Sequence, residues 1–135
     1  SSLPDPYVEE DEYLINISNL KPVYKNYETA KLKIHTRKKH IHPNIYTVAR
    51  NTTRVDLIDD MYYKVSRLAD QLDIISYSDE ELPSYSRLSY DVSGSFFDLD
   101  MSLFEPNYSY QINFLRKDGN ARIEQAETFK FRVEK

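Results

Sequence analysis

The chain has 135 residues, which is the size of a single domain. Apolar residues make up 40% and charged residues 30%, so the composition favours a folded globular chain, and no apolar run approaches the ~18 residues of a membrane-spanning helix. No cysteine and only two glycines occur, which excludes cysteine nucleophiles, cysteine-based zinc sites and glycine-rich phosphate loops. A net charge of −4 argues against a duplex-binding domain, because such domains usually carry a basic excess.

The chain begins with a segment that does not resemble a strand. Residues 1–12 contain two prolines and end in the acidic run Glu9–Glu12, so we expect an extended N-terminal arm followed by one domain over residues 13–135. Apolar and polar residues then alternate over Tyr13–Ser18 and again over Ala30–His35. A period of two indicates strands with one face against a core.

The middle of the chain is less regular. Arg37–His42 is a basic segment, and the following residues 44–60 carry no clear periodicity beyond a short edge strand expected near Ile45–Val48. Alternation resumes at Met61–Ser66, and Leu72–Tyr77 is expected to return beside it as the second strand of a hairpin.

The last third of the chain has the strongest pattern. We expect a short strand at Leu88–Val92 and a long one at Phe97–Leu103. Two further strands, Tyr108–Phe114 and Phe129–Val133, flank the turn sequence Lys117–Asn120. About seven or eight short strands separated by turn residues predict an all-β, antiparallel β-sandwich.

One spacing at the start of the penultimate strand is specific. Phe104, Pro106, Tyr110 and Ile112 follow the pattern apolar-x-Pro-x-x-x-Tyr-x-aliphatic. Proline ends the preceding strand, and the tyrosine can place its ring in the core while its hydroxyl bonds to the backbone of the crossing loop. The pattern resembles the tyrosine corner of fibronectin type III and immunoglobulin-like domains, which implies a sandwich of that type. The chain departs from those domains in lacking a core tryptophan.

The whole chain, cysteine-free and rich in tyrosine, also resembles structural modules of bacteriophage tails and necks. This resemblance implies a non-catalytic structural or adaptor module that contacts other protein subunits of a virion, with self-association as a further option. From the composition we expect no cofactor and no membrane contact, and the net charge argues against nucleic acid as a partner. A carbohydrate-binding or surface-adhesion module is the alternative, and an accessory domain of a larger enzyme is a third interpretation.

Patterns that would carry chemistry are sparse. His40 and His42 share a strand face and could hold a metal, but the neighbouring lysines would repel it. Asp98 and Asp100 also share a face, and we expect them to be solvated acids. We therefore expect no enzyme.

Side chains in loops and on outward strand faces are the candidate interface, since tyrosine is over-represented at interfaces and basic runs set partner choice. These residues are Tyr24, Tyr27, Arg37, Lys38, Lys39, Tyr46, Tyr62, Tyr85 and Phe96.

Overall fold

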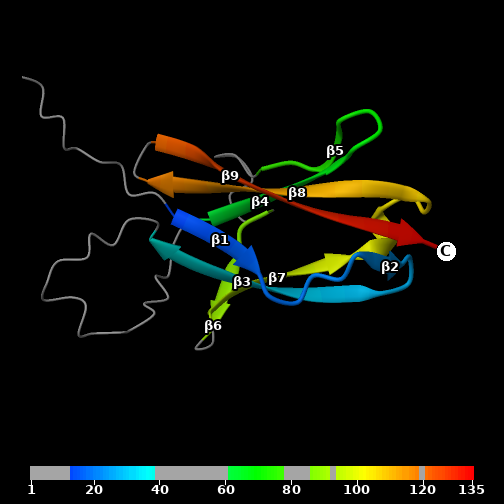
Figure 1. The fold of residues 1–135 in the computed structure, drawn as a ribbon, viewed down its shortest axis with the longest axis horizontal. Helices are drawn as coiled ribbons and strands as arrows, with labels where there is room; N and C mark the ends of the chain where they lie inside the picture. The colour runs from blue at the N-terminus through cyan, green and yellow to red at the C-terminus, as the bar shows by residue number, and fades with distance from the viewer. Residues whose placement is uncertain (1–12, 39–60, 78–85, 92–93, 119–120) are drawn as a thin grey trace, which may run out of the picture.

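The computed structural model describes residues 13–38, 61–77, 86–91, 94–118 and 121–135. These residues form two β-sheets packed face to face, which confirms the all-β sandwich (Figure 1). The four-stranded sheet has, in spatial order, β1 (Tyr13–Ile17), β3 (Thr29–Lys38), β7 (Gly94–Asp100) and β6 (Ser89–Asp91). The five-stranded sheet has β2 (Val23–Lys25), β9 (Ala121–Glu134), β8 (Tyr108–Asp118), β4 (Met61–Arg67) and β5 (Leu72–Ile75).

The core lies between the two sheets and is rich in aromatic rings. Tyr63 of β4 and Phe97 of β7 stack with centroids 4.1 Å apart, which joins the sheets in the middle of the sandwich. Near one end, Tyr110 packs on Phe131 and on Phe104, with centroids 5.7 Å and 4.8 Å apart. Offset and tilted ring pairs of this kind are favourable beyond the area they bury.

Strand β2 was not among the strands predicted from the sequence. It pairs with β9 in parallel, whereas the other strand pairs are antiparallel. Tyr24, expected in an exposed loop, is only 3% exposed and meets Phe131 edge-on at 5.9 Å. Its hydroxyl accepts a hydrogen bond from the amide of Lys21 at 2.9 Å. The expectation that Tyr24 belongs to an interface is therefore wrong.

The structure also corrects the expectation that Tyr62 belongs to an interface. This residue was expected to face solvent because its neighbours Met61 and Tyr63 face the core, but its exposed fraction is 8%. Leu115 of β8 stands opposite it, and Arg87 forms an isolated bridge to it. Strand β4 is thus covered on both faces, which period-two alternation does not reveal.

The predicted strand at 97–103 ends early. Strand β7 stops at Asp100, whose carboxylate accepts hydrogen bonds from the amide and hydroxyl of Ser102 at 3.0 and 2.8 Å. This cap starts a short 3₁₀ helix, η1 (Met101–Leu103), with Met101 buried and Leu103 exposed. The described part of the chain holds no helix with the length and hydropathy that crossing a bilayer requires.

Candidate functional site

The outer face of β3 carries a line of basic side chains. The inward residues Leu32 and Ile34 are buried, so the alternate residues between and beside them point away from the core. The outward positions are, in order, Lys31, Lys33, His35 and Arg37, and we call them the β3 row. Successive members lie about 6.6–6.8 Å apart along the strand, because each residue rises ~3.3–3.4 Å.

The strands on either side do little to neutralise the β3 row. Asp98 of β7 lies opposite Lys31, but Phe96 lies opposite Lys33. On β1, Asn16 pairs with His35. Within the described ranges, no carboxylate forms an ion pair with any member of the row. Among the described residues, the charges of the row are therefore not neutralised by a carboxylate.

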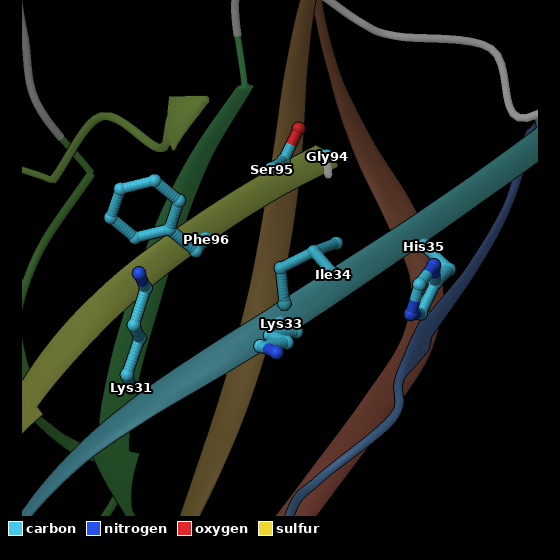
Figure 2. Close-up of a pocket in the computed structure, with 7 residues that line it drawn as sticks. All are labelled: Lys31, Lys33, Ile34, His35, Gly94, Ser95 and Phe96. Carbon is cyan, nitrogen blue, oxygen red and sulfur yellow. The ribbon is translucent and has the colours of Figure 1, made fainter. Parts of the chain in front are cut away.

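Lys31 of β3 and Phe96 of β7 are in contact on this outer face. The Lys31 ammonium lies over the Phe96 ring, 4.1 Å from its centroid, and Figure 2 shows the two side chains together. Beside them is a hollow of about 10 Å³, which has room for about one water molecule. Gly94 borders it with φ +128, a conformation that a residue with a side chain rarely adopts. The hollow is too small for an organic ligand, so this face suits surface contact.

Backbone support for the row comes from Asn19. Its side-chain amide donates to the carbonyl of Lys31 at 2.6 Å, and its side-chain oxygen accepts from the amide of Lys33 at 2.9 Å. Asn19 therefore continues the hydrogen-bond ladder beyond the end of β1. Holding the β3 backbone in this way fixes the spacing of the two lysines.

The hydrogen bond expected for the Tyr110 hydroxyl is present. The Tyr110 hydroxyl donates to the carbonyl of Glu105 at 2.6 Å, and Ile112 is fully buried on the same face of β8. Asn107, in the connecting turn, has φ 73 and donates its amide to Val133 at 2.6 Å. Burial raises the pKa of Tyr110, which keeps its hydroxyl protonated and able to donate. This site is structural.

The remaining predicted interface residues have different positions. Tyr27, in the turn between β2 and β3, is 78% exposed, and Arg37 is exposed at the end of the β3 row. Phe96 is half-buried, and the backbone of Lys38 ends β3. The residues that fall outside the described ranges are Lys39, His40, His42, Tyr46 and Tyr85, together with the edge strand expected at Ile45–Val48.

Sequence reasoning missed Lys31, Lys33 and His35 as candidate site residues. Their outward orientation was predicted, but they were interpreted only as the solvated side of a strand. The signal that distinguishes them is a run of basic outward positions with almost no facing acid. That signal appears only when β1 and β7 are known to be the neighbouring strands.

Acidic groups do not gather into a metal site in the described part of the chain. No group of three or more histidine or acidic side chains is placed there to hold an ion. Asp100 is engaged in capping η1, and its hydrogen bonds from Ser102 lower the pKa of the carboxyl.

Comparisons with known proteins give no family. No protein-family model matches the chain, and no curated protein matches it. Function is therefore inferred from the geometry of the described residues.

Proposed function

We propose that this chain is a non-catalytic module of immunoglobulin or fibronectin type III kind, which holds other protein subunits in a larger assembly. The strand order supports this proposal. In immunoglobulin sandwiches the sheet A-B-E-D faces a sheet built on G-F-C. The order β1-β3-β7-β6 facing β9-β8-β4 follows that arrangement, with β5 beside β4 and β2 beside β9. The Tyr110 corner, at the start of β8, is a second point of agreement.

The observation that carries the proposed activity is the β3 row. It is cationic and lies on a strand that is paired on both sides, and its hollow admits no more than about one water. Such a face has no means to enclose a small substrate, but its charges can steer and align a protein surface of opposite sign. The mechanism is positioning of subunits by several modest contacts, without a chemical step.

The setting that we propose is a virion. This part rests on the resemblance to bacteriophage tail and neck modules, which share the cysteine-free, tyrosine-rich composition. Mass spectrometry of purified particles tests it directly. We expect the chain at a stoichiometric ratio to known shell or tail subunits, and its absence from washed particles would contradict the virion setting.

A carbohydrate-binding or adhesion module is the second candidate. Tyr27, with 78% of its surface exposed, favours it, because an exposed ring can lie against a sugar. Two other surface rings are already covered by cations: Lys31 lies over Phe96, and Arg67 lies 4.9 Å from the centroid of Tyr108. Covered rings offer less area to a sugar, so protein contact is the better-supported function.

Site-specific photocrosslinking tests the proposed function. A benzophenone amino acid replaces Lys33 in one variant and Lys130, an exposed residue of β9 in the other sheet, in the control. In the native assembly we expect a discrete protein adduct from position 33 and little from position 130. Equal or absent crosslinking from both, with saturable binding to one class of sugar on a glycan array, would replace this function by the second candidate.

A further inference from the structure

We propose that the β3 row binds the acidic segment Glu9–Glu12 of a second copy of this chain. This inference rests on the proposed function, because it names one partner for the same face. It joins two observations: a basic row without ion pairs to described residues, and a run of four acids in the same sequence.

Charge complementarity is the first argument. Lys31, Lys33 and Arg37 carry three positive charges on one strand face, although the chain as a whole has a net charge of −4. Two copies therefore repel each other in most orientations. An arrangement that sets acids 9–12 against the row is one of few in which the electrostatic interaction between two copies is attractive. Charge therefore selects the contact geometry.

Spacing is the second argument. In an extended segment, every second side chain lies on the same side, about 6.6–6.8 Å from the next. If the segment binds in an extended conformation, Glu10 and Glu12 have the same spacing as two successive members of the β3 row. In that conformation two ion pairs can form at once without distortion of β3.

The segment's own copy cannot reach Lys31, at the far end of the row. Tyr13, the first residue of β1, pairs with Lys38, so the chain before β1 is attached at the Arg37 end of the row (Figure 1). Glu9 lies four residues before Tyr13 and reaches at most ~14 Å from it. Lys31 is seven positions from Lys38 along β3, or about 23 Å. A second copy is under no such restraint.

The proposed contact needs several ion pairs at once, because each one alone is weak. Ion pairs between exposed side chains are individually weak and are screened by salt. Self-association by this route is therefore modest in dilute solution and strong where an assembly holds the copies close together. Strong dependence on ionic strength is its signature.

Two matched charge reversals test the inference in the full chain. One variant reverses the row by Lys33→Glu with Arg37→Glu, and the other reverses the segment by Glu10→Lys with Glu12→Lys. The control, Lys130→Glu with Lys135→Glu, makes the same change in charge as the row variant at exposed positions of the other sheet and the C-terminus. Circular dichroism verifies that each variant is folded, and sedimentation velocity measures self-association at low salt.

We expect the unchanged chain to self-associate at low salt and to dissociate at about 0.5 M salt, where the Debye length is only a few ångströms. Each reversed variant should associate about tenfold more weakly, and an equimolar mixture of the two should recover the original affinity, because every row then finds a segment of opposite sign. The control should follow the unchanged chain, apart from a general repulsion that also weakens the row variant.

Three results would overturn the inference: a chain that is monomeric at all concentrations up to about 1 mM, a mixture that does not recover, or a control as weak as the row variant. Photocrosslinking from position 33 to a different protein would still support the proposed function in each of these cases. Failure of the second copy as partner is therefore distinguishable from failure of the protein-contact role.

Discussion

The hydroxyl of Tyr110 and the backbone carbonyl of Glu105 are joined by a hydrogen bond of 2.6 Å, formed where the chain crosses from one sheet to the other. The Tyr110 ring is fully buried against Phe104 and Phe131. One side chain therefore contributes to the core and also satisfies a carbonyl of the crossing loop. The loop between η1 and β8 is fixed by this bond.

Replacing Tyr110 by phenylalanine tests the contribution of that bond. The ring keeps its packing, but the Glu105 carbonyl loses its partner, so we expect a loss of about 1–2 kcal/mol in the free energy of unfolding. Urea denaturation measures it. Tyr27→Phe removes a hydroxyl from an exposed ring and should change stability by less than about 0.5 kcal/mol. Equal midpoints for Tyr110→Phe and the unchanged chain would mean that the bond has no net effect.

The edge of strand β1 is covered by a carboxylate from the other sheet. The amide of Ile15 donates to Oε2 of Glu127 in β9 at 2.9 Å. Edge strands expose unpaired amides that invite pairing with other chains, so this contact protects the edge. In Glu127→Ala we expect the Ile15 amide to exchange with solvent about tenfold faster, measured by hydrogen–deuterium exchange. Glu127→Gln retains an acceptor oxygen and should show a smaller change, whereas unchanged exchange in both variants would argue against edge protection.

The turn between β4 and β5 contains a pH-dependent ion pair. Arg67 donates to the carboxylate of Asp70 at 2.6 and 3.0 Å, which lowers the pKa of Asp70 to about 2, and it also reaches Glu105 at 3.0 Å. The pKa of Asp70 is lower in the folded chain than in the unfolded chain, where it is ~3.9. The resulting stability is present above pH ~4 and is lost as the pH falls toward 2.

Asp70→Asn should therefore flatten the decline of stability between about pH 4 and pH 2. Denaturation midpoints across that range measure the effect, and an NMR titration gives the pKa of Asp70 itself. Asp98→Asn removes an acid without an ion pair among the described residues and serves as the control. A normal pKa for Asp70 would show that the Arg67 contact does not persist in solution.

Tyr77 links the end of β5 to β9 and acts in the opposite pH range. Its hydroxyl donates to the Glu124 carboxylate at 3.0 Å, and burial together with that bond raises the pKa of Tyr77. Because the folded chain favours the neutral phenol, the stability is present below the unfolded pKa of ~10 and is lost as the pH rises above it.

Tyr77→Phe should be less stable at neutral pH and should lose less additional stability above pH ~10 than the unchanged chain does. Denaturation at several alkaline pH values measures this, and phenolate absorbance counts the tyrosines that titrate late. Tyr27→Phe provides the comparison for an exposed phenol. If the unchanged chain, Tyr77→Phe and Tyr27→Phe all lose stability equally as the pH rises above ~10, the pH dependence does not come from Tyr77.

The regular parts of the fold could be predicted because alternation reports directly on burial. Lys31 and Leu32 of β3, or Lys130 and Phe131 of β9, differ in polarity as they differ in exposure. Alternation failed where both faces of a strand are covered, as at Tyr62. It also failed at β2, which is too short to show a period although it places Tyr24 in the core.

The candidate site was harder to predict, for a related reason. The sequence indicates that Lys33 points outward, but it does not say which strands lie beside it. Whether a surface lysine is neutralised depends on those neighbours, and here they are Phe96 on β7 and a ladder extended by Asn19. Strand order is a property of the assembled sheet, so the significance of the β3 row emerged only from the structure.

The most direct measurement of the central claim is lysine footprinting of the chain inside its native assembly. Acetylation of Lys33, read by mass spectrometry, is compared between the isolated chain and the assembly, with Lys130 as the reference. If the outer face of β3 is the contact surface, Lys33 becomes protected by about tenfold in the assembly while Lys130 keeps its reactivity. Equal reactivity of Lys33 in both states, with Lys130 protected instead, would contradict the account.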